Sequence, residues 1–408
     1  MSSDIDTIRE LAKQVAEIAA EDLQEERREK WRRHNEFEHV PPPIYVRAVA
    51  ERELIAPTLS CADPFFRSHE RFLRRMILQQ TLGDDYVIEP WLTVRAALIL
   101  LPQGEWGVPL RRAMTDEISG GFTIDPGMKH LEDFEKLVTP RHEVDEEETR
   151  RRVSKLEEAV DRVLSIEVDR SPFWTGWHGD VSTDIGYLRG IEQMLWDMMD
   201  NPDWLHELLG FMRDGILKAH REAEDAGHWR LSNHENQSMP YAASLEDPKA
   251  NGDAVKREDL WLFVASQETG AVSPEMFDEF MLQYQEPIMR EFALVSYGCC
   301  EDLSHKVKFL KRIPNLRRVA VTPFADLKTC AEQLGDGYIC SWRPSPADMV
   351  AYEFSEERVR RTVRNARDIF RENGCRFDVC LKDVETVQHD GSRLKKFVEI
   401  VRAEAGDG

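Results

Sequence analysis

The segment from Tyr297 to Asp302, Tyr-Gly-Cys-Cys-Glu-Asp, holds the densest group of reactive side chains in the sequence. It follows the apolar run 293–295, so we expect it where a strand ends and a loop begins. Its two thiols and two carboxylates could bind a soft metal such as zinc. Alternatively, one thiol could be a nucleophile whose pKa is lowered by the N-terminus of the following helix. A third interpretation is that both cysteines are buried packing residues, and the sequence leaves all three open.

Other cysteines also lie near the ends of predicted strands, and Cys380 could be brought by the last strand toward Cys299 and Cys300. Zinc needs three or four convergent ligands, which different strand ends can supply. We therefore assign Cys299, Cys300 and Cys380 as candidate metal ligands. No CxxC or HxxxH spacing is present, so spacing alone gives only a weak metal signal. Three further cysteines are expected to pack as small apolar side chains: Cys61, Cys330 and Cys375.

Two histidines follow predicted strands, and each stands near an acid in the sequence. His178 precedes Asp180, and His234 precedes Glu235. A histidine with a carboxylate at a strand end suits metal ligation, general acid–base catalysis or polar substrate binding. We assign His178, His234 and Glu268 as candidate catalytic residues, while a loop histidine without function remains the alternative for His178 and for His234.

Several other polar side chains are placed at predicted strand ends. Together they describe a charged pocket for a carboxylated or phosphorylated ligand, with tryptophans as aromatic walls, although aromatic residues in strands usually belong to the core. The candidate substrate-binding residues are Arg47, Tyr297, Asp326, Arg343 and Lys382.

Short β-rich apolar runs alternate with helical periodicity along the chain, which favours an α/β fold with a parallel sheet. Eight units predict a single (β/α)8 TIM barrel over residues 41–408, after an N-terminal helical extension over residues 1–40. A doubly wound open sheet is the alternative. The predicted strands are 44–49, 86–94, 173–177, 229–232, 293–297, 318–322, 338–342 and 377–381.

Three segments stand apart from this alternation. Residues 102–170 and 233–258 are long insertions, which in a barrel usually form lids or pocket walls at the catalytic face. The charged run over residues 21–34 is expected to be a surface helix.

The composition excludes several classes of function. The 408 residues contain 54 Lys and Arg against 76 Asp and Glu, a net charge of −22, which disfavours nucleic-acid and membrane-surface binding. The first residues do not resemble a secretory signal, and the longest apolar stretch, 96–101, is too short to span a bilayer. Seven cysteines without a disulfide pattern indicate a reducing compartment, so we expect a cytoplasmic protein with a small-molecule substrate.

Four segments of the sequence resemble the uroporphyrinogen decarboxylase superfamily, which includes corrinoid-dependent methyltransferases. Residues 43–50 (PIYVRAVA) are similar to the family's N-terminal P-V-W-x-M-R-Q-A-G-R motif. Residues 182–190 are similar to its T-L-A-x-Y-L-x-G helix, and residues 262–274 to Q-x-F-D-S-W-A-G-x-L-S-P. Residues 315–349 resemble the two strands before its N-x-D-P turn. The resemblance covers about 43–403 and implies a (β/α)8 barrel.

Departures from the family pattern separate its branches. Of the decarboxylase's paired arginines only Arg47 is present, and no Asp stands in register at 86–90. The methyltransferase branch holds zinc with His-x-Cys on one strand and Cys on the last strand. Tyr297-x-Cys299 occupies the first pattern with Tyr in place of His, and Cys380 lies in the last strand.

The resemblance therefore implies a methyltransferase that moves a methyl group between a small methylated substrate and a corrinoid carrier, with zinc as a Lewis acid. The D-x-H-x-x-G corrinoid motif is absent, so the corrinoid would arrive on a partner protein. Two alternatives remain: a metal-independent decarboxylase or lyase that uses Arg47, Arg343 and Lys382 to bind carboxylates, and a barrel that only binds a tetrapyrrole.

Overall fold

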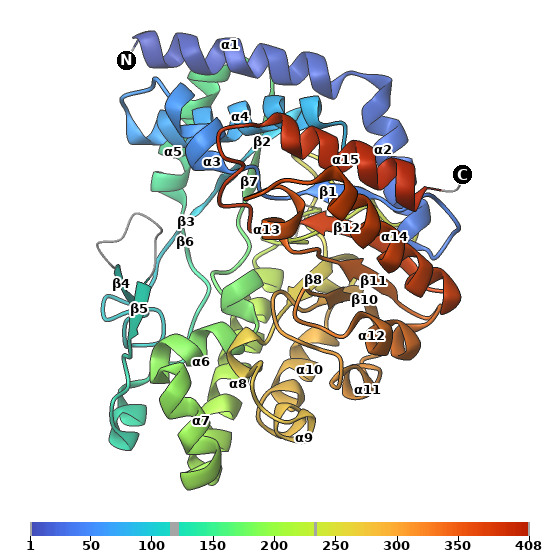
Figure 1. The fold of residues 1–408 in the computed structure, drawn as a ribbon. Coiled ribbons are helices and arrows are strands. Elements are labelled where there is room, and N and C mark those ends of the chain that lie inside the picture. The colour runs from blue at the N-terminus through green and yellow to red at the C-terminus, as the bar shows by residue number, and fades with distance from the viewer. Residues whose placement is uncertain (1, 115–121, 232–234, 407–408) are drawn as a thin grey trace.

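The computed structural model describes residues 2–114, 122–231 and 235–406 and has an α/β fold built on a curled parallel sheet (Figure 1). Six strands form this sheet in the order β1-β12-β11-β10-β9-β8, and every neighbouring pair is parallel. The strands are β1 (Ile44–Val46), β8 (Trp261–Val264), β9 (Leu294–Tyr297), β10 (Leu316–Val321), β11 (Ile339–Trp342) and β12 (Arg376–Leu381).

A second parallel unit, β2 (Trp91–Arg95) with β7 (Ser165–Asp169), supplies two more strands. The eight strands and their covering helices confirm the predicted barrel class, distorted because β2–β7 is a separate hydrogen-bonded unit. Two predicted strand positions are wrong. Residues 173–177 form a loop that enters a 3₁₀ turn, and 229–231 are irregular. The strands found instead are β7 and β8. Both are short runs between polar segments, so the sequence pattern did not identify them as strands.

Two aspartates explain why β2 does not pair with β1. The backbone N–H of Ile44 donates to Oδ2 of Asp85 at 2.8 Å, and that of Val46 donates to Oδ2 of Asp84, also at 2.8 Å. These carboxylates satisfy the edge of β1 that a neighbouring strand would otherwise occupy. Burial raises the pKa of Asp84 to about 6.

Helices cover the outer face of the six-stranded sheet (Figure 1). Two short antiparallel pairs lie outside it: β3 (Ala97–Leu98) with β6 (Val144–Asp145), and β4 (Arg111–Met114) with β5 (Phe122–Asp125). α9 continues through a π-helical segment, 278–282, into α10. The helices after β7 are α6 (Ser182–Arg189), α7 (Ile191–Asp200), α8 (Pro202–Asp225), α9 (Pro274–Phe277), α10 (Gln283–Met289), α11 (Val307–Leu310), α12 (Leu327–Leu334), α13 (Pro346–Met349), α14 (Glu356–Glu372) and α15 (Ser392–Ala405).

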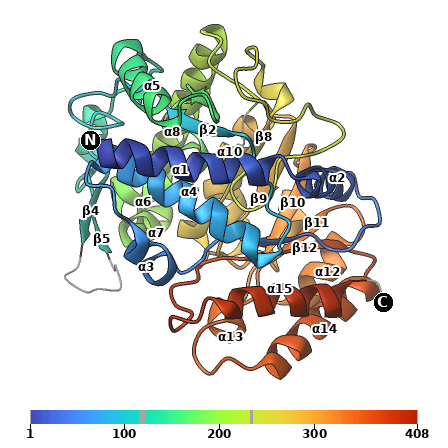
Figure 2. The same cartoon turned by 90° about the horizontal axis from the view of Figure 1, so that it is seen from above.

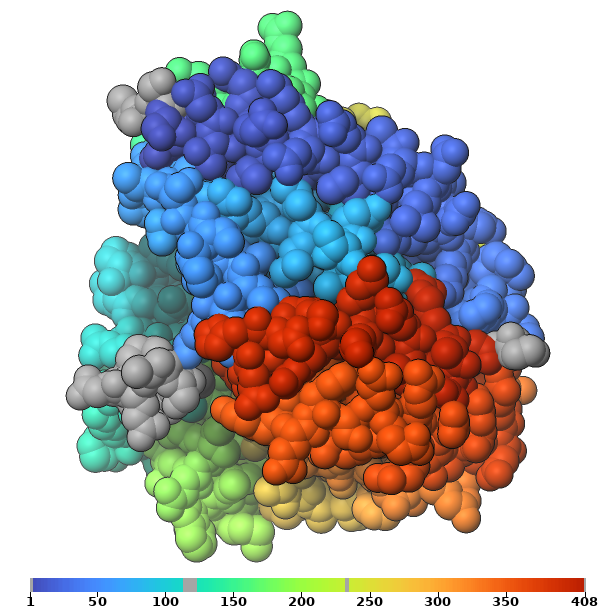
Figure 3. Space-filling model, turned by 45° about the horizontal axis from the view of Figure 1, so that its top comes forward, coloured from blue at the N-terminus to red at the C-terminus, as the bar shows by residue number. Residues whose placement is uncertain are grey.

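A separate apolar cluster holds β2 and β7 against the N-terminal helices. Seen from above, α1 lies across α4 (Figure 2). α15 contacts α4 as well, so the C-terminal helix packs against the same helix that α1 covers (Figure 3). In the N-terminal part of the chain, α1 spans Ser2–Ala19, α3 spans Glu51–Leu54, α4 spans Pro64–Leu82 and α5 spans Glu146–Val160.

The charged run forms a helix at the surface, α2 (Asp22–Asn35), but one face of it is buried against the sheet, which the sequence did not predict. Trp31 is fully buried and donates from its indole nitrogen to the carbonyl of Asp85 at 2.7 Å. Nε2 of His34 lies 3.2 Å from Oδ2 of Asp378 on β12. The buried face of α2 could not be predicted from the charged sequence, because its buried contacts are polar.

Side chains along β12 alternate between the two faces of the sheet. Asp378, Cys380 and Lys382 therefore share one face, with Lys382 just beyond the carboxyl end of the strand. Asp378 belongs to the layer that α2 covers, and Lys382 to the carboxyl edge where barrel enzymes carry their active sites.

Within the described part of the chain, no helix is both long enough and apolar enough to cross a membrane.

Candidate functional site

Two adjacent thiols meet a lysine at the carboxyl edge of the sheet. Cys299 and Cys300 follow β9, and Lys382 follows β12. Nζ of Lys382 donates to Sγ of Cys299 at 3.1 Å and to Sγ of Cys300 at 2.9 Å. The two sulfurs lie 3.5 Å apart. Because β9 and β12 belong to one parallel sheet, their carboxyl ends bring these three residues together.

Polar contacts hold the thiols in place. Nε2 of Gln237 donates to Sγ of Cys299 at 3.1 Å. The Glu301 carboxylate accepts the backbone N–H of Cys299 at 2.8 Å and that of Ser266 at 2.9 Å. Arg343, which is buried, donates to the carbonyl of Cys299 at 2.6 Å. The loop after β9 is therefore tied to the ends of both β8 and β11.

The two thiols differ in acidity. The pKa of Cys299 is lowered to about 6, first because Cys300 hydrogen-bonds to its sulfur, and also because Arg343 and Lys382 place positive charge nearby; burial opposes this. The same contact with Cys299 raises the pKa of Cys300, and burial adds to the effect. Cys299 therefore ionises more readily than Cys300, which makes it the better nucleophile of the two. The next helix, α11, begins only at Val307, so neighbouring cations supply the effect that we had expected of a helix N-terminus.

We expect the alkylation of Cys299 by iodoacetamide to follow a pH profile with a midpoint at about 6. Cys300→Ala removes the hydrogen-bond donor and should move that midpoint upward. The measurement is mass spectrometry of the Cys299 peptide over a pH series. Cys61→Ala, in a different apolar cluster, is the matched control and should change nothing. A wild-type midpoint near 8.5, roughly that of a free thiol, would contradict the assignment.

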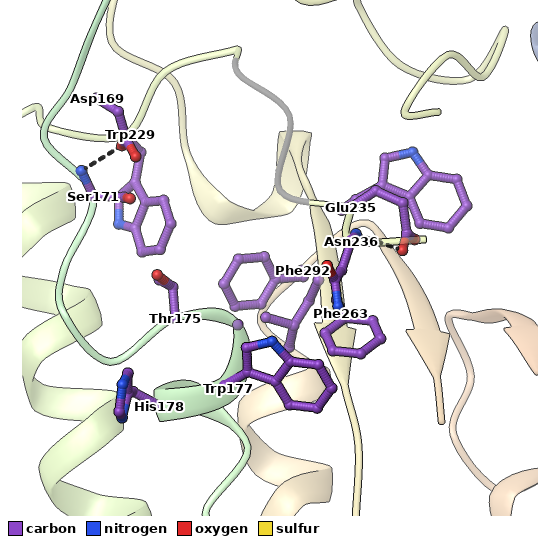
Figure 4. Close-up of a pocket in the computed structure, with 13 residues that line it drawn as sticks. Asp169, Ser171, Thr175, Trp177, His178, Trp229, Glu235, Asn236, Phe263 and Phe292 are labelled. Carbon is purple, nitrogen blue, oxygen red and sulfur yellow. Dashed lines mark hydrogen bonds between the residues drawn. The ribbon is translucent and has the colours of Figure 1, made fainter. Parts of the chain in front are cut away.

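A cavity of about 270 Å³ lies along β8, whose residues Trp261, Leu262 and Phe263 line it (Figure 4). Trp177 and Phe263 form part of its wall, and the same two rings pack in an apolar cluster with Cys299 and Cys300. Their ring centroids lie 5.1 Å apart in an edge-to-face arrangement. The cavity and the reactive sulfur are therefore separated by one layer of side chains. Asn236 also lines the cavity, so the insertion 233–258 contributes to its wall as expected.

His178 lies at one end of this cavity, on the 3₁₀ turn Gly176–Gly179 (Figure 4). Its Nδ1 is 2.6 Å from Oδ1 of Asp184, and Oδ2 of that carboxylate accepts from the Trp106 indole at 2.7 Å. The His178 ring stacks on Phe173 with centroids 4.2 Å apart. A carboxylate on one ring nitrogen fixes the imidazole and leaves the other nitrogen for proton transfer.

Glu268 is held by a contact to α6. Its Oε2 accepts from the hydroxyl of Ser182 at 2.7 Å, and burial raises its pKa. Burial, followed by the charge of Glu268, raises the pKa of Asp180 well above its ordinary value. Glu268 is thereby tied to α6, the helix that also carries Asp184, the partner of His178.

The remaining candidates separate into two groups. Arg47 lies at the carboxyl edge of the sheet and donates to the backbone and side-chain oxygens of Asn236 at 2.9 and 2.8 Å. Tyr297 is fully buried and donates to Oε1 of Gln285 on α10, away from the thiols. Asp326 accepts the N–H of Thr329 at 2.6 Å as the N-cap of α12. These contacts give Tyr297 and Asp326 packing and capping roles.

Cys380 lies two residues before Lys382 on the same strand face, in a cluster with Tyr45 and Trp31. Burial raises its pKa to about 12, which disfavours the thiolate that a metal requires.

A zinc site needs at least three ligands. Among the described residues no group of three or more His, Cys, Asp or Glu side chains is placed to hold a metal ion. The ammonium of Lys382 contacts both sulfurs at the position where a cation would bridge them. His234 lies outside the described residues. The described geometry thus does not fit zinc, which remains a sequence prediction, and we build no step on it.

Sequence reasoning missed Gln237 and Asp184 as site residues. Both act through tertiary contacts: Gln237 reaches Cys299 from a loop 62 residues away in sequence, and Asp184 reaches His178 from the next helix. Asp184 follows His178 by only six positions in the sequence, so this pairing could have been predicted.

No protein-family model matches this sequence, and no curated protein matches it. Among solved structures, a methyltransferase from Methanosarcina mazei has a similar fold, with a TM-score of 0.52 and 11% sequence identity. The match covers 92% of this chain and 97% of that chain. At this identity the likeness establishes the fold, which extends over nearly the whole of both chains.

Proposed function

We propose that this protein is a methyltransferase in which the thiolate of Cys299 accepts a methyl group from a small methylated donor. The observation that carries the proposal is the pair of thiols at the carboxyl edge of the sheet, where Lys382 contacts both sulfurs. The fold likeness to the Methanosarcina mazei methyltransferase supports it.

The transfer is a displacement at the methyl carbon. A lone pair of the Cys299 sulfur forms the new S–C bond, and the bond from that carbon to the donor's oxygen, nitrogen or sulfur breaks. The leaving group takes the electron pair. Where it needs a proton, His178, oriented by Asp184, can supply one at the edge of the cavity. Lys382 and Gln237 hold the sulfur during attack.

A nucleophilic carrier then removes the methyl group, which restores the thiolate. The sequence resemblance implies that this carrier is a corrinoid on a partner protein. Cys300 stays protonated beside Cys299, because a second thiolate 3.5 Å away would raise the energy of the pair.

The alternative of a metal-independent decarboxylase or lyase requires cations that are ready to bind carboxylates. Arg343 donates to the carbonyls of Gly298 and Cys299, and Arg47 donates to Asn236. Lys382 contacts the two sulfurs. The three cations thus serve the protein's own loops and thiols, and this favours methyl transfer.

The test supplies donors whose methyl groups carry carbon-13, drawn from alcohols, amines and sulfides, together with free reduced cobalamin as the carrier. NMR should show the label leaving at least one donor class only when both protein and carrier are present. Label that stays on every donor would overturn the proposal. Release of carbon dioxide from uroporphyrinogen in a parallel reaction would support the decarboxylase instead.

We expect Asp184→Asn to lower kcat by about 10- to 100-fold with little change in KM, because the amide no longer fixes the His178 imidazole. Steady-state assay with the active donor is the measurement. Asp200→Asn, at the end of α7, is the control and should behave as wild type. An Asp184→Asn enzyme with full kcat would show that His178 is not the proton donor.

A further inference from the structure

We propose that Cys299 and Cys300 form a reversible disulfide with each other when the protein meets a hydroperoxide, so that the pair is an oxidation site as well as a nucleophile. The formation of this bond stands on the geometry of the two sulfurs. Its consequence, the loss of methyl transfer in the oxidised protein, rests on the proposed function.

The two sulfurs are held close together. They lie 3.5 Å apart, and a disulfide bond requires about 2.05 Å. Nζ of Lys382 contacts both sulfurs, at 3.1 Å and 2.9 Å, and so keeps them on the same side of the chain. Because the two cysteines are adjacent in sequence, the bond can close without the movement of any other segment.

The pair borders the solvent on the side of Cys300. Cys299 is 3% exposed, whereas Cys300 is only partly buried. Sγ of Cys300 lies 3.8 Å from Oδ2 of Asp383, whose side chain is 61% exposed. A small oxidant such as hydrogen peroxide can therefore approach the sulfurs past Cys300.

The oxidation takes place in two steps. The sulfur of Cys299, which ionises more readily, attacks one oxygen of the peroxide; an S–O bond forms, the O–O bond breaks, and hydroxide leaves. The sulfur of Cys300 then attacks the resulting sulfenic acid. The S–S bond forms, the S–O bond breaks, and the thiol proton of Cys300 leaves with the hydroxyl group as water. Two electrons pass from the sulfurs to the peroxide.

The contacts that hold the loop do not depend on the thiols. Glu301 accepts the backbone N–H of Cys299, and Arg343 donates to its carbonyl. Lys382 loses its contact with an ionisable sulfur but keeps the Asp383 carboxylate at 2.8 Å. Oxidation should therefore remove the nucleophile while the surrounding fold persists.

A disulfide between neighbouring residues is easily reduced. Consecutive Cα atoms are about 3.8 Å apart, shorter than the roughly 4.4–6.8 Å that an unstrained disulfide spans. Strained disulfides are the labile ones, so a thiol reductant should restore both cysteines. Closure of the ring also protects Cys299, because a sulfenic acid without a nearby thiol goes on to the irreversible sulfinic acid.

Mass spectrometry tests the proposal on a single peptide. Trypsin cleaves after Arg290 and Lys306, so both cysteines lie in the peptide 291–306. After treatment with hydrogen peroxide and then N-ethylmaleimide, we expect this peptide to be lighter by two hydrogen atoms and to carry no label. Dithiothreitol added before the label should restore both thiols and the methyl-transfer activity, which falls in proportion to the disulfide.

Cys300→Ser removes the second thiol, and dimedone should then trap the sulfenic acid on Cys299. Cys61→Ala is the matched control, because Cys61 is 1% exposed in another apolar cluster, and it should form the disulfide as wild type does.

A wild-type peptide that keeps both thiols, or on which Cys299 becomes a sulfinic acid, would overturn the inference, as would a dimer cross-linked through Cys299. A disulfide that forms in a protein from which no labelled donor loses its methyl group would leave the oxidation site standing and refute the proposed methyl transfer. Methyl transfer that persists in peroxide because no disulfide forms would do the reverse.

Discussion

Cys299→Ser should abolish methyl transfer, with a fall in kcat of about 10³-fold or more, since the loss of a covalent nucleophile removes the reaction path itself. A hydroxyl is far less acidic than a thiol, so Lys382 and Arg343 cannot hold it ionised at neutral pH. The serine side chain is nearly isosteric, and the fold should persist because Glu301 binds the backbone N–H of residue 299 rather than its side chain.

Cys300→Ser is the matched control for this variant. Its hydroxyl can still donate to the neighbouring sulfur, so we expect kcat within about tenfold of wild type. Circular dichroism should show both variants folded. If Cys299→Ser keeps wild-type activity, or if Cys300→Ser loses as much as Cys299→Ser, Cys299 is not the methyl acceptor.

Asp378→Ala should lower the free energy of unfolding by about 3–5 kcal/mol, because it leaves the buried Arg318 guanidinium without its counterion. Oδ2 of Asp378 accepts from Arg318 at 2.5 Å, and its Oδ1 accepts from Ser341 at 3.0 Å. Both charged residues are 1% exposed. His34 contacts the same carboxylate, so α2 should loosen as well.

Urea unfolding monitored by tryptophan fluorescence measures this loss. Asp368→Ala, a carboxylate exposed on α14, is the control and should shift stability by no more than about 0.5 kcal/mol. The charge of Arg318 brings the pKa of Asp378 below its ordinary value although burial opposes it. The stabilisation should therefore hold above that ordinary pKa and disappear as the pH falls through the lowered one. Equal stability of the two variants would contradict the role of Asp378.

Strand-end reasoning could group residues from distant parts of the sequence because parallel strands deliver their carboxyl ends to one edge. Cys299, Cys300, Arg343 and Lys382 were all identified from sequence, and the structure brings them into contact. The sequence pattern could not show which side chains at a strand end point into the barrel and which point outward. Tyr297, one residue before the chain turns at Gly298, faces α10 instead of the site.

The features of the fold that could not be predicted from the sequence depend on polar contacts between distant segments. The charged helix α2 has few apolar residues, yet Trp31, His34 and Asn35 bury against the sheet through hydrogen bonds. Hydrophobic periodicity cannot detect such a face. β8 was missed because a four-residue apolar run does not distinguish strand from helix.

The central claim is that the methyl group resides on the sulfur of Cys299 during turnover. The most direct measurement mixes the protein with the donor found active in the carbon-13 screen, now with a deuterium-labelled methyl group, in the absence of a carrier, quenches with acid and analyses the Cys299 peptide by mass spectrometry. We expect one labelled methyl group per chain on Cys299, which disappears when reduced cobalamin is added before the quench. An unmodified Cys299 in a reaction that consumes donor once the carrier is present would contradict the account.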